Sequence, residues 1–142
     1  MGYRRMAREA ALGYLYQSDL GLQTRTDNPQ VFAKHFEIPD DSREFFVNLV
    51  QGVLKEQTLI DQELQRVSEH WKLQRMARVD RVVLRMAAWE LMFSKETPFK
   101  VILDEAVEIA KKFSTSESAS FVNGLLDELA KTYRAEPESA LK

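Results

Sequence analysis

Three arginines near the amino terminus are the residues best suited to bind a polyanion. Arg4, Arg5 and Arg8 all precede the first acidic residue of the chain. On a helix, at about 100° per residue, Arg5, Arg8 and Tyr16 lie along one stripe, with Arg4 at its border. Guanidinium groups bind phosphates, and a tyrosine ring can stack on a base or donate a hydrogen bond. The pattern predicts a helix that binds single-stranded nucleic acid; the plainer alternative is a solubilising cluster paired with nearby acids.

A second basic cluster lies later in the chain and has a structural explanation. It consists of Lys72, Arg75, Arg78, Arg81 and Arg85, interrupted only by Asp80. Because it flanks and enters the most apolar helix of the sequence, we expect it to support the fold. Arg85 is expected to be held by a carboxylate or by carbonyls at a helix end, and Trp71 to anchor the turn before the cluster.

Catalytic and metal-binding chemistry has little support in the sequence. The five glycines are scattered and form neither a phosphate-binding loop nor a dinucleotide-binding fingerprint. His35 and His70 lie far apart, each without a histidine or acid at metal-ligand spacing. The adjacent carboxylates of Asp104-Glu105 and Asp127-Glu128 would point about 100° apart on a helix, which is typical of a solvated face. We therefore expect no enzyme, no metal and no cofactor.

Length indicates one domain, and the composition is compatible with a reducing compartment. The chain has 142 residues, a net charge of −2 and no cysteine. This length is typical of a single domain, and the lack of cysteine excludes disulfides and thiolate metal sites. The amino-terminal segment is basic and then amphipathic, unlike a signal peptide, so we expect a cytoplasmic protein. A net charge of −2 would not attract nucleic acid, so any such attraction must come from the two local basic clusters.

The helix that organises the chain is predicted between Val79 and Phe93. Its apolar residues cover most of the helical cylinder, which places it inside the fold, and it is too short and too charged to span a membrane. Periodicity predicts further helices at about 4–22, 29–36, 41–54, 59–70, 98–113 and 115–135, with a loop at 23–27. The predicted N-caps are Asn28, Asp41, Thr97 and Ser114. No segment alternates as a strand should, so the fold class is all-α.

Four segments together resemble the NusB family of bacterial transcription antitermination factors. In order, they are RRMAREAALGYLYQ, VDRVVLRMAAWEL, PFKVILDEAVEIAKKF and FVNGLLDELAK. Four collinear blocks covering nearly the whole chain are much more specific than any one of them. The resemblance implies about seven helices in two small side-by-side bundles around a buried central helix. It implies a single domain over 1–142, with bundles at about 1–70 and 71–135 and a frayed tail at 136–142.

The same resemblance implies a function and partners. The family binds the boxA element of nascent ribosomal RNA leaders together with ribosomal protein S10. The pair joins other Nus factors on RNA polymerase and suppresses premature termination. We therefore expect boxA RNA, S10, other Nus factors and RNA polymerase as partners, and no membrane. The sequence leaves the oligomeric state open.

Site residues are also implied by the resemblance, position by position. The RNA-binding residues are Arg4, Arg5, Arg8, Glu117, Ser120 and Phe121, and the residues facing S10 are Tyr16 and Asp80. From periodicity alone, Phe121 is most simply a core residue. Met6 stands where some members carry a further arginine, which implies weaker RNA binding without S10. Gln74 replaces an acid found in some members, which removes one expected ionic contact.

Two other functions remain as alternatives. One is the NusB-like accessory domain of ribosomal RNA cytosine methyltransferases, but this chain contains no cofactor-binding unit, which favours a stand-alone factor. The other is a helical adaptor whose basic helix meets an acidic protein. Titration of a boxA-like RNA with and without S10 distinguishes an RNA-binding factor from such an adaptor, because the adaptor should not bind the RNA in either case.

Overall fold

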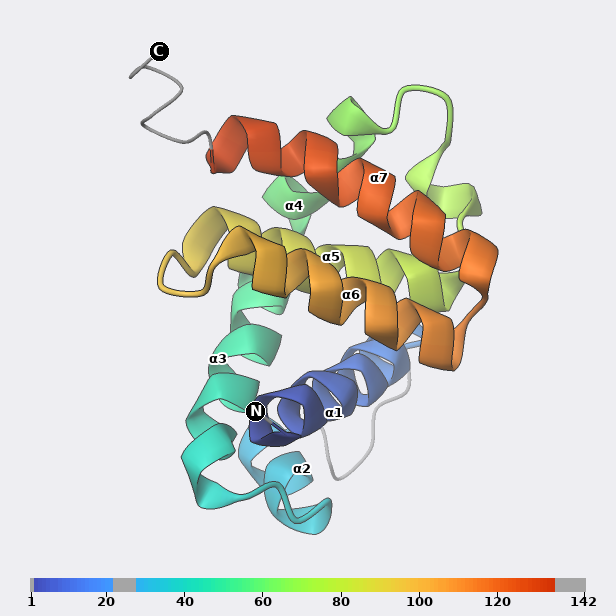
Figure 1. Cartoon of the computed structure of the whole chain (residues 1–142). Helices are drawn as coiled ribbons and strands as arrows, with labels where there is room; N and C mark the ends of the chain where they lie inside the picture. The colour runs from blue at the N-terminus through green and yellow to red at the C-terminus, as the bar shows by residue number, and fades with distance from the viewer. Residues whose placement is uncertain (1, 22–27, 135–142) are drawn as a thin grey trace. The chain divides into compact units, whose positions relative to one another are not determined.

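The computed structural model of the chain describes residues 2–21 and 28–134. They form the helices α1 (Gly2–Asp19), α2 (Pro29–His35), α3 (Asp40–Lys55), α4 (Gln57–Val67), η1 (Leu73–Arg75), α5 (Arg78–Phe93), α6 (Phe99–Phe113) and α7 (Ser116–Tyr133) (Figure 1). No strand occurs in these residues, so the predicted all-α fold class is confirmed. The loop predicted at 23–27 and the tail predicted at 136–142 lie outside the described residues. No helix in the described ranges is long and apolar enough to cross a membrane.

Of the four predicted N-cap residues, only Asn28 caps its helix in the structure. The Oδ1 atom of Asn28 accepts a hydrogen bond from the Gln30 amide at 2.8 Å, which caps α2 ahead of Pro29 as expected. The cap of α7 is Thr115, one residue after the predicted Ser114, and its Oγ1 accepts from the Ser118 amide at 2.9 Å. The remaining two predictions are wrong, because α3 and α6 begin behind prolines that supply no side-chain acceptor.

The chain divides into two compact units, residues 1–57 and 58–142. The sequence places the split near the loop around Gln57 or later, with bundles at about 1–70 and 71–135, and the division seen here lies at the early end of that range. Long-range contacts explain why α4 groups with the second unit, because α4 is bonded to later parts of the chain. Its Asp61 binds Arg85 of α5, and its Glu63 accepts a hydrogen bond from the Tyr133 hydroxyl at 2.9 Å.

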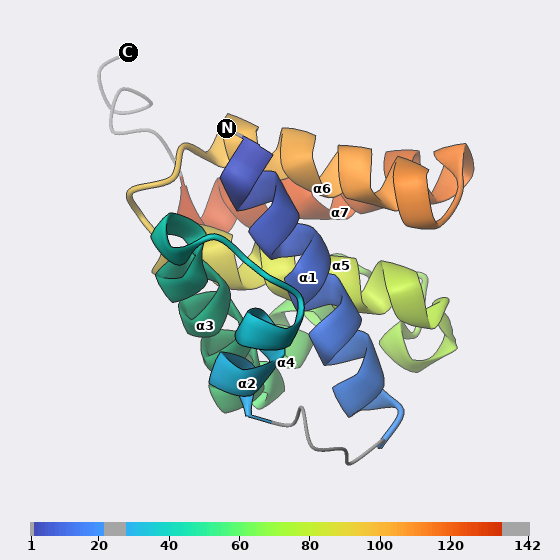
Figure 2. The ribbon, with the colours of Figure 1, turned by 90° about the horizontal axis from the view of Figure 1, so that it is seen from below.

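The first unit is built from α1, α2 and α3, which pack on one another (Figure 2). Its core contains three aromatic rings, one from each helix: Tyr14, Phe32 and Phe46. Tyr14 meets Phe32 edge-on, with ring centroids 5.1 Å apart, and Phe32 stacks on Phe46 at 5.7 Å. Such pairs add stability beyond the burial of their area, so they hold α1 at a fixed rotation on α3.

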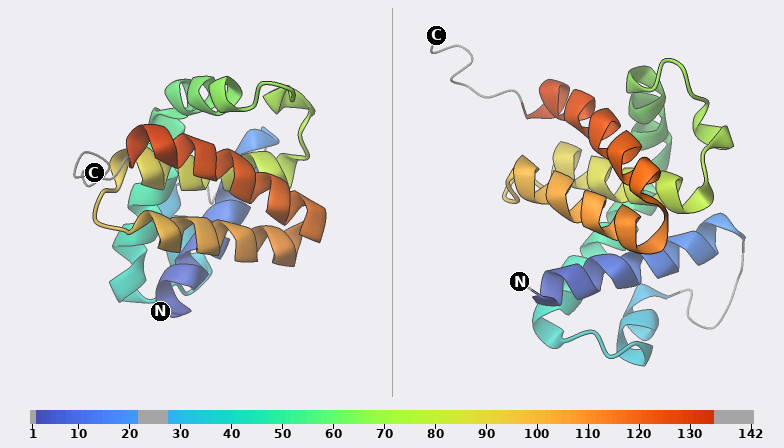
Figure 3. Two further views of the ribbon diagram at one scale, coloured as in Figure 1. Left: turned by 45° about the horizontal axis from the view of Figure 1, so that its top comes forward. Right: turned by 45° about the vertical axis from the view of Figure 1, so that its right-hand side comes forward.

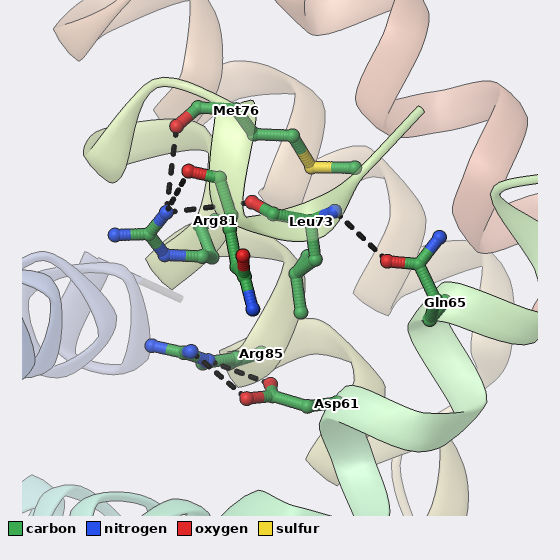
Figure 4. Close-up of polar contacts among 7 residues, drawn as sticks. Asp61, Gln65, Leu73, Met76, Arg81 and Arg85 are labelled. Carbon is green, nitrogen blue, oxygen red and sulfur yellow. Dashed lines mark hydrogen bonds and ion pairs between the residues drawn. The ribbon is translucent and has the colours of Figure 1, made fainter. Parts of the chain in front are cut away.

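The second unit has α5 at its centre, as the sequence predicted. Helices α5, α6 and α7 pack against one another (Figure 3), and nearly every side chain of α5 between Val82 and Met92 is buried. The Arg85 guanidinium makes a two-bonded ion pair with Asp61, at 2.8 and 2.9 Å (Figure 4). The expectation that a carboxylate holds Arg85 is therefore confirmed.

The carboxyl end of α5 is closed by an arginine from the end of α7. Arg134 donates hydrogen bonds to four backbone carbonyls, those of Glu90, Leu91, Ser94 and Thr97, at 2.8 to 3.0 Å. Carbonyls at the end of a helix have few partners within that helix. The Arg134 guanidinium therefore adds donors to the end of α5 and to the turn after it, and joins this region to the end of α7.

Candidate nucleic-acid interface

The three arginines of α1 differ in their exposure. Arg4 and Arg5 are exposed, whereas Arg8 is only 4% exposed. Tyr16, two turns further along, is half-buried. On the predicted stripe, Arg5 is therefore exposed and Arg8 is buried. Two arginines of one sequence motif thus have different surroundings.

An aromatic ring from α3 explains how Arg8 is accommodated. The Arg4 guanidinium carbon lies 4.6 Å from the centroid of the Phe45 ring, and that of Arg8 lies 4.9 Å from the same centroid. Both distances fall within the range of cation–π attraction, which is stronger where water is excluded. Phe45 thus fixes Arg8 in the unit and holds the exposed Arg4 in a defined place. A guanidinium stacked on a ring keeps its N–H groups for other acceptors.

Asp80, expected to face S10, lies in the first turn of α5 and is 6% exposed. Its Oδ2 atom accepts a hydrogen bond from the Ser118 hydroxyl of α7 at 2.8 Å. Within the described residues, Oδ1 is buried and lacks a hydrogen-bond partner. Buried polar atoms are nearly always paired, so Oδ1 is an acceptor for which a donor is missing.

The amino-terminal half of α7 carries the other implied RNA contacts. Glu117 and Ser120 are exposed, and Phe121 is half-buried rather than a full member of the core. Phe121 meets Trp71 edge-on, with ring centroids 5.7 Å apart and planes at 77°. Trp71 itself is 59% exposed. Its backbone carbonyl anchors the turn after α4 by accepting two hydrogen bonds, from the side chains of Gln65 and Ser68.

The second basic cluster is structural in part, as expected. The Nη1 atom of Arg81 faces the carbonyls of Leu73, Gln74 and Met76 at 3.3 to 3.5 Å (Figure 4), so it holds the segment before α5. Lys72 and Arg75, in contrast, are exposed. They lie one and four residues after the exposed Trp71.

Nothing in the described residues resembles a metal centre. No group of three or more histidine, cysteine or acidic residues there is arranged to hold an ion. His35 and His70 are both exposed, on different units.

Fold and surface define the class of the molecule: a small all-helical protein with exposed guanidinium groups on its first helix and a partly exposed aromatic pair on a later one. A family model described as the NusB family matches residues 5–131. The chain belongs to the NusB family.

Individual relatives agree with this assignment. The chain is 48% identical, over 91% of both sequences, to the transcription antitermination protein NusB of Trichlorobacter lovleyi. It is 45% identical to that of Sorangium cellulosum, over 92% of this chain and 93% of the relative. Both relatives are named transcription antitermination proteins.

Solved structures share the fold. NusB of T. maritima superimposes with a TM-score of 0.80 at 35% identity, covering 98% of this chain and 97% of that one. A structure of the antitermination factors NusB and NusE in complex with double-stranded RNA gives a TM-score of 0.79 at 29% identity, covering 94% of this chain and 99% of the matched chain.

Proposed function

We propose that this protein is an RNA-binding transcription antitermination factor. In this proposal it binds boxA of nascent ribosomal RNA leaders together with NusE, ribosomal protein S10, and joins other Nus factors on RNA polymerase in the cytoplasm. The observation that carries the proposal is the pair of exposed arginines on α1 in a chain that belongs to the NusB family. A solved relative in complex with NusE and RNA gives further support.

Arg4 and Arg5 are the direct phosphate contacts in this proposal. Two phosphates neutralised on a single strand give a salt slope of about −1.4, and three give about −2. Arg8 belongs to the site as the residue that, with Phe45, keeps Arg4 in place. Both slopes are modest, which is consistent with a second protein sharing the RNA.

Tyr16 and Asp80 are the proposed contacts with S10. Support for Asp80 comes from its buried Oδ1, which has no partner within the described residues. If the Asp80 side chain turns outward, a donor from a partner protein satisfies this acceptor and removes the cost of an unpaired buried oxygen.

Glu117, Ser120 and Phe121 are the proposed RNA contacts of α7. Glu117 and Phe121 are four residues apart, so they lie on the same face of the helix. A carboxylate repels phosphate but accepts hydrogen bonds from base amino groups. In this proposal α7 therefore meets bases, whereas α1 meets phosphates.

Titration of a labelled boxA-like RNA, with and without S10, tests the proposed function. We expect binding that is weak alone, strengthens when S10 is added, and falls with a scrambled RNA of the same length. An adaptor that binds only proteins would leave the RNA unbound under both conditions, and this result would refute the proposal.

A further inference from the structure

Trp71 combines a highly exposed side chain with a backbone that is held by hydrogen bonds. Its indole is 59% exposed, the highest exposure among the large hydrophobic residues in the described ranges. A single exposed apolar residue needs no explanation by itself. Here, however, the backbone beneath the ring is held by several hydrogen bonds, and the ring has an aromatic neighbour.

Buried and half-buried polar groups hold the backbone of this turn. The Trp71 carbonyl accepts one hydrogen bond from the Gln65 amide nitrogen at 2.9 Å and another from the hydroxyl of the buried Ser68 at 3.0 Å. The Oε1 atom of Gln65 accepts from the Leu73 amide at 2.9 Å (Figure 4). The turn is thereby fixed on both sides of Trp71, so the exposed ring is presented by a rigid backbone.

The Phe121 ring supports the indole from α7. The two rings meet edge-on at 5.7 Å, an arrangement that restrains the indole without covering both of its faces. Since α7 is a long helix packed on α5, the position of Phe121 is itself defined. The pair is thus ordered in advance, and a planar ligand would lose little of its binding energy to ordering it.

Charge around the pair favours an anionic ligand. Exposed Lys72 and Arg75 follow Trp71 by one and four residues in the chain, and exposed Glu69 precedes it by two. An aromatic face beside basic side chains is the combination with which proteins bind single-stranded nucleic acids, where bases stack and phosphates pair with cations.

We propose that the Trp71 indole, supported edge-on by Phe121, is a stacking platform for an unpaired base of RNA, with Lys72 and Arg75 binding the adjacent phosphates. This inference rests on the proposed function and extends it from Phe121, an implied RNA contact, to Trp71, Lys72 and Arg75, which are not among the implied contacts. A base stacked on a ring contributes binding that depends little on salt. Removal of the indole should therefore weaken affinity about 5- to 150-fold and leave the salt slope unchanged.

Fluorescence provides a direct test, because the chain has two tryptophans, Trp71 and Trp89. In Trp89→Phe, Trp71 is the only tryptophan, and we expect a boxA-like single-stranded RNA to quench its emission. The same RNA annealed to its complement should quench less, because its bases are already stacked. Labelled-RNA anisotropy then compares Trp71→Ala with Trp71→Phe, which should retain part of the affinity.

Phe93→Ala is the matched control. Phe93 is an exposed aromatic that pairs with Trp89 at the opposite end of α5, roughly 22 Å along the helix axis from Arg78. Its replacement should leave RNA affinity unchanged. Melting curves establish that each variant is folded, since Trp71 is exposed and its replacement should shift the midpoint little.

Three results would overturn the inference. If RNA binds but neither quenches Trp71 nor discriminates Trp71→Ala from the parent, the platform is refuted while the proposed function stands. If Trp71→Ala weakens binding to S10 in the absence of RNA and leaves RNA binding unchanged, the surface is a protein contact. If the parent protein binds no RNA with or without S10, the proposed function fails, and the platform fails with it.

Discussion

Arg8 and Arg5 should respond to replacement in opposite ways, although both belong to one arginine motif. Arg8 is buried and lies 4.9 Å from the centre of the Phe45 ring. Loss of a desolvated cation–π contact costs about 2 kcal/mol. We expect Arg8→Ala to reduce the free energy of unfolding by that amount and to lower Tm by roughly 6–10 °C. Arg5→Ala removes an exposed side chain and should change stability by less than about 0.5 kcal/mol.

The salt dependence of RNA binding should show the reverse pattern, with a large effect for Arg5→Ala and a small one for Arg8→Ala. Arg5→Ala should flatten the salt slope of RNA binding by about 0.7, the contribution of one phosphate on a single strand. Arg8→Ala, measured below its melting transition, should keep the slope of the parent and weaken affinity only through the loosened Arg4. Thermal melts and filter binding across a salt series measure both quantities. The reasoning is refuted if Arg8→Ala flattens the slope by about 0.7 and melts like the parent, since Arg8 would then contact phosphate itself.

Three further predictions concern the second unit. Asp61→Asn removes the ion pair with the buried Arg85 guanidinium and should cost about 2–4 kcal/mol, which urea denaturation measures. A cost below about 0.5 kcal/mol would contradict the role of the pair. Arg134→Ala leaves carbonyls at the end of α5 without their donor and should cost about 2–3 kcal/mol, with Arg134→Lys intermediate in the same assay. Burial, together with the hydrogen bond to Glu63, raises the pKa of Tyr133 above its usual value. The neutral Tyr133 hydroxyl therefore contributes to the free energy of unfolding in full below about pH 10, and this contribution is lost as the pH rises through the folded-state pKa. Above that pH, the free energy of unfolding of Tyr133→Phe should fall less steeply with pH than that of the parent.

The helices were predictable because each carries a periodic apolar pattern. The α5 helix has apolar residues around most of its circumference and is buried as expected. In α7, the period continues through Asn123-Gly124, a pair typical of tight turns, and the helix continues as well. Local hydrogen bonding was harder to predict, because Thr97 and Ser114 are good capping residues that the backbone leaves just outside the capping position.

Features that depend on distant residues were not predictable from local patterns. The burial of Arg8 depends on Phe45, which comes from another helix. The grouping of α4 with the second unit depends on partners such as Arg85 and Tyr133, 24 and 70 residues from their counterparts. Helical periodicity places residues on faces, but it does not say which ring or ion pair a face will meet.

The two units offer contacts of different physical kinds, and salt can separate them. Attraction between the arginines of α1 and phosphate weakens as salt rises, because each counterion released from the RNA gains less entropy when the bulk salt concentration is higher. Stacking on Trp71 depends on apolar and π contact and changes little with salt. The factor by which Trp71→Ala weakens RNA binding should thus be the same at low and high salt, whereas the factor for Arg5→Ala should shrink. Anisotropy titrations of both variants at two salt concentrations measure this. Equal shrinkage for both variants would mean that Trp71 acts through the neighbouring Lys72 and Arg75 and not by stacking.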